Sequence, residues 1–165
     1  ELAGIPENIA DFVTRNNLTE VFEIKNPMYF YSNATVRDTV LIFEKLSGMK
    51  AIPGQDLKAK CKVLGLDTIL DAGNEKRSIN RQEAALVLAR LYSLKNGVNI
   101  DKFRPSRLIF INDEGNIDNK ALSKVYLSVD LGFLSLDGKG NFLPQKAVTV
   151  IELLSAYEKV FDKTR

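Results

Sequence analysis

The sequence predicts an all-α fold made of three tandem helix–loop–helix repeats, and three observations support this prediction. A capping-box pattern occurs three times, each time directly before an apolar helical run. A shorter amphipathic helix precedes each box and ends at a residue that tolerates the left-handed backbone conformation. The distance from that residue to the following box is similar in each copy. An arrangement kept three times along the chain indicates an internal repeat.

The capping box pairs a small polar residue with an acid three positions later. The oxygen of the first residue accepts a hydrogen bond from the backbone N–H of the acid, and the carboxylate accepts one from the backbone N–H of the first residue. We therefore expect long helices to begin directly after positions 35, 80 and 149. The three boxes are Thr35-Val36-Arg37-Asp38, Asn80-Arg81-Gln82-Glu83 and Thr149-Val150-Ile151-Glu152.

Each box opens an apolar helix. In the first and third helices the apolar residues recur with helical spacing, which predicts one buried face. The second helix, expected from Arg81 to about Leu94, is apolar on most sides, so we expect it to be the most buried. The stripes are Val36, Val40, Phe43 and Leu46 in the first helix and Val150, Leu153, Leu154, Tyr157 and Phe161 in the third.

A shorter amphipathic helix precedes each box. Pro6 suits the opening turn of the first, and Asp118 is expected to cap the third. Each ends at Asn or Gly, followed by an apolar residue that covers the last turn. The ends are Asn17-Leu18, Gly65-Leu66 and Gly132-Phe133, and positions 17, 65 and 132 precede box positions 35, 80 and 149 by 18, 15 and 17 residues.

Length and composition place the chain among globular domains. It has 165 residues, of which 45% are hydrophobic and 27% charged. The net charge of +2, from 23 basic and 21 acidic residues, argues against general nucleic-acid or membrane-surface binding. No apolar run approaches a membrane span, and Glu1 does not begin a signal-peptide pattern. Because the chain starts without Met, we expect it to be a piece of a longer protein.

Several chemistries are excluded by the residues that the sequence lacks. Histidine is absent and Cys61 is the single cysteine, which excludes zinc sites of Cys and His and triads with a His base. Cys61 is expected in the core. The loops 112–116 and 137–141 lack the ligand spacing of a calcium loop and are interpreted as turns. We expect no metal, no cofactor and no enzyme activity, because the acids that stand out are explained by helix caps.

The third copy resembles a repeat of the S-layer homology family along most of its length. Ile111-Asn112-Asp113 is similar to the family's aromatic-x-Asp opening, and Leu131-Gly132-Phe133-Leu134 matches its Gly-Ile-Ile segment. The stretch from Asp137 to Pro144 matches Gly-x-Phe-x-Pro, and Val148-Thr149-Val150-Ile151-Glu152 occupies the position of Val-Thr-Arg-Ala-Glu. In the second copy, residues 79–84 are similar to the Thr-Arg-Ala-Glu signature. The first copy retains Thr35 and Asp38.

The resemblance implies one module over residues 1–165, with repeats at approximately 1–50, 51–100 and 101–165. In this family three repeats form a pseudo-threefold unit around a central three-helix bundle. The grooves between repeats bind a pyruvylated secondary cell-wall polysaccharide, or a peptidoglycan-linked glycan. The resemblance thus implies an extracellular location at the bacterial cell surface, with further domains of an exported protein attached and with neither nucleic-acid binding nor membrane insertion.

By the same resemblance, Arg81 contacts the acidic ketal of the glycan, with Asn80 and Glu83 around it. Val36 and Val150 stand where the other two copies would carry this Arg. The further glycan-binding positions are Thr35 and Asp38, Thr149 and Glu152, and Asp113 of the opening motif.

Physical chemistry leaves alternatives open at these positions. Arg81 lies in the first turn of a helix, where the macrodipole disfavours a cation unless an anion binds to the helix N–H groups. The alternative is that Arg81 pairs with Glu83 or with an acid of a neighbouring repeat. For the box acids, and for Thr35, Asn80 and Thr149, a structural capping role is favoured.

Two further segments have both a structural and a functional interpretation. The aromatic cluster at residues 29–31 either stacks on sugar rings or fills the core of the first copy, and we favour the core. In the basic segment 102–107, Arg104 and Arg107 either add to an anionic groove or belong to a solvated linker, which we favour.

Two hypotheses follow for the function. The first is a non-catalytic anchoring module that binds the acidic wall polysaccharide. The second is a degenerate module with a structural or protein-interaction role and no glycan binding, because two of the three signatures lack the Arg.

Overall fold

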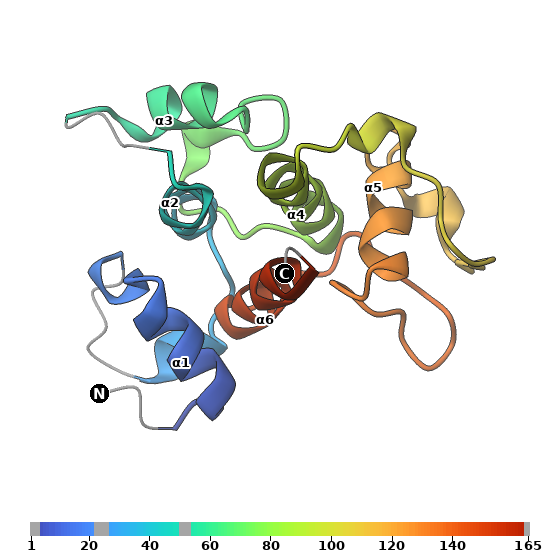
Figure 1. Ribbon diagram of the computed structural model, residues 1–165, viewed down its shortest axis with the longest axis horizontal. Coiled ribbons are helices and arrows are strands. Elements are labelled where there is room, and N and C mark those ends of the chain that lie inside the picture. The colour runs from blue at the N-terminus through green and yellow to red at the C-terminus, as the bar shows by residue number, and fades with distance from the viewer. Residues whose placement is uncertain (1–3, 22–26, 50–53, 164–165) are drawn as a thin grey trace. The chain divides into compact units, whose positions relative to one another are not determined.

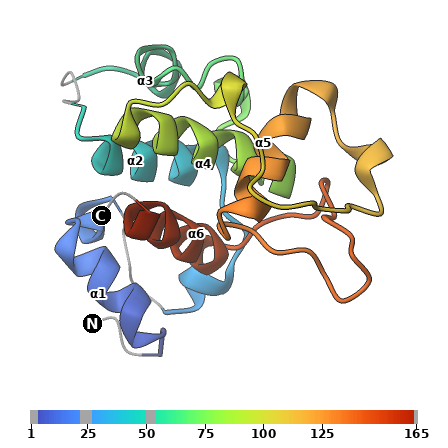
Figure 2. The ribbon, with the colours of Figure 1, turned by 45° about the vertical axis from the view of Figure 1, so that its right-hand side comes forward.

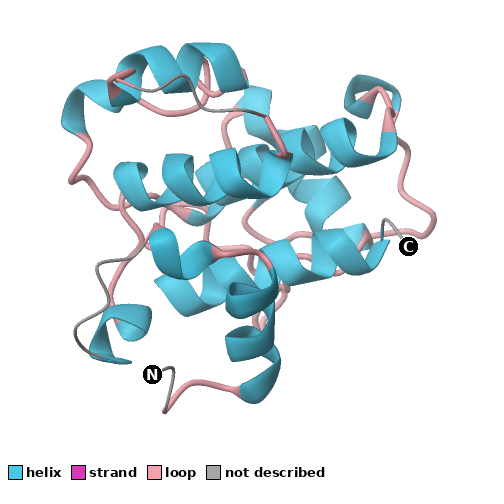
Figure 3. Cartoon of the chain, turned by 60° about the vertical axis from the view of Figure 1, so that its left-hand side comes forward, coloured by secondary structure: helices cyan, strands magenta, loops and turns pink. Residues whose placement is uncertain are grey.

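The computed structural model describes residues 4–21, 27–49 and 54–163, and all regular structure in this part of the chain is helical (Figures 1 and 3). This confirms the predicted all-α class. Strand-like pairing in the described residues is limited to isolated bridges. The repeat boundary expected between positions 50 and 51 lies outside them. The helices are α1 (Glu7–Arg15), α2 (Val36–Ser47), α3 (Leu57–Leu64), α4 (Arg81–Asn96), α5 (Asn119–Asp130) and α6 (Val150–Lys163).

The chain divides into two compact units. Unit 1 contains Glu1–Ile79 and Val148–Ser155, and unit 2 contains Asn80–Ala147 and Ala156–Arg165, so α6 contributes residues to both. Within unit 1, α2 packs against α3, and within unit 2, α4 packs against α5 (Figure 2). The expectation of a single module with three repeats stays a prediction.

The three predicted capping boxes are present at the starts of α2, α4 and α6. In each, the first residue accepts from the backbone N–H of the acid, and the acid accepts from the backbone N–H of the first residue. These reciprocal bonds explain why the helices begin where the sequence predicts. The two distances are 3.1 and 3.1 Å for Thr35 with Asp38, 2.9 and 3.1 Å for Asn80 with Glu83, and 3.2 and 3.0 Å for Thr149 with Glu152.

The predicted ends of the short helices are confirmed as well. The residues at these three helix ends, Asn17, Gly65 and Gly132, have positive φ. This conformation is costly for residues other than Gly and Asn. The apolar residue after each is buried against the preceding helix end, as the helix-stop motif requires. The φ values are 55° at Asn17, 74° at Gly65 and 80° at Gly132, and the buried residues are Leu18, Leu66 and Phe133.

The core follows the predicted apolar stripes. Every residue from Ala84 to Ala89 is buried, which covers more than one full turn, so α4 is enclosed on all sides over this stretch. Cys61 is buried on α3, and this burial raises the pKa of its thiol to about 11. The thiol is thus protonated at neutral pH and acts as a small apolar core residue.

The prediction that the Asp118 side chain caps α5 with a hydrogen bond is wrong. Asp118 occupies the N-cap position of α5, but its side chain makes no capping hydrogen bond. Its carboxylate accepts from Nε2 of Gln82 at 3.1 Å, and its backbone N–H donates to Oε1 of Gln82 at 3.1 Å. The amide group of Gln82 therefore ties the start of α5 to α4, and this partner outcompetes the local cap.

Of the two segments with a structural and a functional interpretation, the aromatic cluster needs correction. Of the aromatic cluster only Phe30 is buried, while Tyr31 is 51% exposed and its hydroxyl donates to the carbonyl of Gly4 at 2.9 Å. The interpretation of Arg104 and Arg107 as part of a solvated linker is confirmed by their exposure, and Ser106 and Arg107 in addition bind the carboxylate of Asp130 at the end of α5. That carboxylate holds the segment between the second and third copies in place within unit 2.

Candidate functional site

The first N–H groups of α2 and α4 donate to carbonyls that lie far away in the sequence, in what the sequence analysis predicts to be another copy. At α2, in unit 1, the N–H of Val36 donates to the carbonyl of Arg77 and that of Arg37 to the carbonyl of Glu75, both at 2.9 Å. These carbonyls belong to the second copy. They satisfy donors that a helix start otherwise leaves open.

The same arrangement occurs at α4 in unit 2. The N–H of Arg81 donates to the carbonyl of Lys146 at 2.9 Å, and that of Gln82 to the carbonyl of Pro144 at 3.1 Å. Both carbonyls belong to the third copy. The expectation that these N–H groups complement a bound carboxylate is therefore wrong, because they already have partners.

The Arg81 side chain lies against the third copy. Its Nε donates to the carbonyl of Phe142 at 2.7 Å and its Nη2 to the carbonyl of Ser135 at 2.6 Å. The guanidinium carbon is 4.7 Å from the centre of the Phe142 ring, within range of a cation–π contact. These carbonyl dipoles and the ring offset the unfavourable position of a cation at a helix start.

Asp113 holds the same loop from the other side. Its Oδ1 accepts from the N–H of Phe142 and its Oδ2 from the N–H of Leu143, both at 2.8 Å. Leu143 has φ of 58°, a left-handed conformation that is strained for Leu. We call Arg81, Asp113 and the Phe142 main chain the Phe142 clamp, since one side chain binds the carbonyl and the other the N–H.

The adjacent loop forms a turn, as the sequence predicts. Asp137 Oδ1 accepts from the N–H of Asn141 at 2.8 Å and from that of Lys139 at 2.9 Å. These N–H groups, with Asn141 the larger influence, hold the pKa of Asp137 below its usual value of 3.8, and the charges of Lys139 and Arg81 add to the effect. In the part of the chain described, no three Asp, Glu, Cys or His side chains are grouped closely enough to hold a metal ion.

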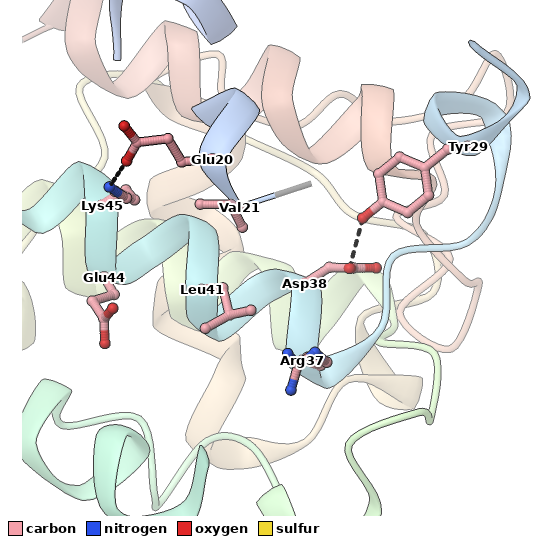
Figure 4. Close-up of a pocket in the computed structure, with 8 residues that line it drawn as sticks. All are labelled: Glu20, Val21, Tyr29, Arg37, Asp38, Leu41, Glu44 and Lys45. Atoms are coloured by element: carbon pink, nitrogen blue, oxygen red, sulfur yellow. Dashed lines mark hydrogen bonds and ion pairs between the residues drawn. The ribbon is translucent and has the colours of Figure 1, made fainter. Parts of the chain in front are cut away.

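A groove of about 540 Å³ runs along α2 in unit 1 (Figure 4). We call it the α2 groove. Acidic and basic side chains face it together with one aromatic ring, so its lining is mainly polar. Its lining residues are Glu20, Val21, Tyr29, Arg37, Asp38, Leu41, Glu44 and Lys45.

Two contacts lie toward opposite ends of the α2 groove, and both are drawn in Figure 4. Lys45 Nζ lies 2.5 Å from Oε2 of Glu20, and the Tyr29 hydroxyl donates to Oδ1 of Asp38 at 2.6 Å. Partial burial and the neighbouring Asp38 carboxylate raise the pKa of Tyr29 far above its ordinary value, so the hydroxyl remains a donor. Tyr29 thus combines a fixed ring with a polar edge in the groove wall.

Two cations line the groove, Arg37 and Lys45, and Arg37 has the longer ion pair. Its Nη1 is 3.8 Å from Oε1 of Glu75, and the two side chains are 56% and 43% exposed. Glu44, further along α2, pairs with Lys60 at 3.1 Å. All residues that line the α2 groove lie between positions 20 and 45, and Glu75 and Lys60 pair with two of them from later in the chain.

The predicted glycan-binding residues fall into separate local clusters within the two units. Asp38 lines the α2 groove and Thr35 is its capping partner, while Arg81 and Asp113 meet through the main chain of Phe142. Asn80 and Glu83 form the box of α4, and the amide of Asn80 also donates to Oε1 of Gln145 at 3.2 Å. Thr149 and Glu152 form the box of α6.

Sequence reasoning missed Arg37. It lies in the first capping box, one position after Val36, where the family signature would carry Arg. A basic residue next to the expected position was the available signal. Glu20 and Lys45 gave no signal, since they are 25 residues apart and join only in the folded chain.

No protein-family model matches this chain, and no curated protein is significantly similar to it. The resemblance to the S-layer homology family therefore stays a prediction. None of the described helices combines the length and the apolar character needed to cross a bilayer.

Proposed function

We propose that this chain is a non-catalytic module that anchors a larger exported protein to the bacterial cell surface by binding an acidic wall polysaccharide. Its three copies form a pseudo-threefold unit around a central bundle of α2, α4 and α6. Support comes from the repeated boxes and from backbone bridges that link the box segments of different copies. These bridges are Asn33 with Thr149 and Thr35 with Ser78, both within unit 1, and Asn80 with Ala147 within unit 2.

The observation that carries the proposal is the weakly held Arg37 in the α2 groove. A guanidinium binds a carboxylate through two parallel hydrogen bonds, the geometry that a pyruvate ketal offers. The ion pair with Glu75 is long and exposed, so giving it up costs little. Tyr29 supplies the flat face against which a sugar ring packs.

Co-sedimentation with purified wall sacculi, and titration with the soluble pyruvylated polysaccharide, test this proposal. Arg37→Ala is expected to weaken binding about tenfold, the loss of a hydrogen bond to a charged group. Lys62→Ala is the matched control, because Lys62 is an exposed cation of α3 outside the groove and its loss changes the net charge equally. Polysaccharide stripped of its ketal should bind both variants alike.

Two results would contradict the proposal. One is unchanged affinity of the Arg37→Ala protein for the pyruvylated polysaccharide. The other is an equal loss with Lys62→Ala, which would indicate bulk electrostatics rather than a site. Circular dichroism of each variant establishes that the helices are retained.

A second candidate function is a degenerate module with a structural or protein-interaction role and no glycan binding. The Phe142 clamp favours it, because Arg81 already binds two carbonyls and an aromatic ring. Immobilised polysaccharide should then retain none of the protein, and cell-surface proteins should retain it instead. A pulldown on both supports separates the two candidates.

A further inference from the structure

The segment from Leu108 to Ile111 is an extended strand-like stretch in unit 2. It contains no helix, turn or bend, and it lies between the helical turns η4 (Ile100–Lys102) and η5 (Glu114–Asn116). Exposure alternates along it: Leu108 is 81% and Phe110 73% exposed, Ile109 is half-buried and Ile111 is buried. This period of two is the pattern of a strand with one face in the core.

The main chain of this segment presents an open edge. Within the described residues, the N–H and C=O groups of Leu108, Ile109 and Phe110 make no hydrogen bond. Both flanks are anchored, because Ser106 binds Asp130 and the N–H of Asn112 donates to the carbonyl of Gly140 at 2.9 Å. A fixed row of unpaired donors and acceptors is a template for pairing with another strand.

We propose that this edge pairs antiparallel with the same segment of a second copy of the chain, centred on Ile109. In that register Leu108 of each copy stands opposite Phe110 of the other, and the two residues exchange both main-chain hydrogen bonds. Their side chains lie on the same face and cover each other, which removes exposed apolar surface from water. The pairing satisfies the open edge and the exposed side chains together.

The charges around the segment favour a second copy over an acidic partner. Arg107 already has Asp130 at 3.5 Å, so it contributes little unbalanced charge. Arg104 binds only its neighbouring carbonyl in the described part of the chain. An antiparallel partner brings the C-terminal flank of its own segment, which carries Glu114, to the end of the pairing where Arg104 lies. Because the paired stretch is short, the dimer is weak and depends on concentration.

Sedimentation velocity over a range of concentrations tests the association. The wild-type protein is expected to shift from monomer to dimer as its concentration rises, and Phe110→Asp to remain monomeric throughout. Met28→Asp is the control, since Met28 is 68% exposed in unit 1, away from the segment in sequence. Wild-type protein that stays monomeric, or dimers that survive Phe110→Asp, would overturn the proposal.

Disulfide trapping tests the register. In a Cys61→Ala background, a Leu108→Cys protein is mixed with a Phe110→Cys protein. Residues in a hydrogen-bonded antiparallel pair have Cα atoms about 5.5 Å apart, which a disulfide spans. The mixed disulfide is expected in about fivefold excess over either self-paired product, because only the mixed pair brings the two cysteines directly opposite. The twofold excess that random pairing gives, or less, would overturn the register. Monomeric protein that floats with anionic lipid vesicles through Phe110 would assign the segment to a membrane surface and overturn the dimer.

Discussion

The starts of α2 and α4 are built alike but treat their arginines differently. Both begin with a reciprocal capping box, and both give their first N–H groups to carbonyls of another copy. At α4, Arg81 is held by two carbonyls and a ring, whereas at α2, Arg37 has one long, exposed ion pair beside a groove. An arginine in a capping box is thus fixed by several contacts in one place and only loosely held in the other.

The largest expected effect is a difference in stability between two alanine variants. Arg81→Ala should lower the free energy of unfolding by about 2–3 kcal/mol, because it removes charged hydrogen bonds to Phe142 and Ser135. Arg37→Ala should cost about 0.5 kcal/mol or less, the usual value of an exposed ion pair. Urea denaturation followed by circular dichroism measures both, and equal losses would remove the distinction between the two helix starts.

A double-mutant cycle sharpens the account of the Phe142 clamp. Arg81 and Asp113 bind opposite sides of one peptide segment, so their losses should not add. We expect a coupling energy of about 1 kcal/mol between Arg81→Ala and Asp113→Ala. Arg37→Ala with Asp113→Ala is the control cycle and should be additive to within about 0.5 kcal/mol. Additivity in the first cycle would show that the two residues act independently.

A smaller effect is expected from relieving backbone strain in the same loop. Leu143→Gly should raise the free energy of unfolding by about 0.5–1 kcal/mol, because Gly adopts positive φ without a steric penalty. Asn17→Gly, at the other described non-glycine residue with positive φ, should change it by only a few tenths of a kcal/mol, since Asn tolerates this conformation. Destabilisation by Leu143→Gly would mean that the Leu side chain outweighs the strain.

The smallest effect is a pH dependence of the turn beside the clamp. The folded pKa of Asp137 is lowered, so its contribution to stability is complete above its unfolded pKa. That contribution is lost as the pH falls through the lowered folded value. The protection of the Asn141 amide against exchange, measured by NMR between pH 5 and pH 2 relative to the intrinsic rate at each pH, should fall on acidification in the wild type. In the Asp137→Asn protein the Asn141 amide should show no change that follows titration of residue 137.

Features that depend on neighbouring residues were predictable from the sequence. The box from Thr35 to Asp38 closes within one helical turn, and the helix end at Gly65 requires only a residue that tolerates positive φ. Such local hydrogen bonds are determined by the types of three or four consecutive residues. The starts of the long helices were therefore predicted correctly.

The hydrogen-bond partners that a polar side chain finds far away in the sequence were not predictable. Arg81 reaches Phe142 and Ser135, which are 61 and 54 residues away, and nothing in its own helix selects those carbonyls. Asp118 carries a good cap residue type, yet its carboxylate goes to Gln82, 36 residues away. Long-range packing decides between a local and a distant partner, so type and spacing alone misplaced both residues.

The carbonyls that close the start of α4 have a consequence for the order of events during synthesis. Residues 81 and 146 are joined by a backbone hydrogen bond, so the ribosome must add 65 further residues before the N–H of Arg81 meets its partner. Until then the nascent helix holds only its own Asn80 box. We therefore expect the first turn of α4 to fray in emerging chains and to become firm only as the last copy leaves the exit tunnel.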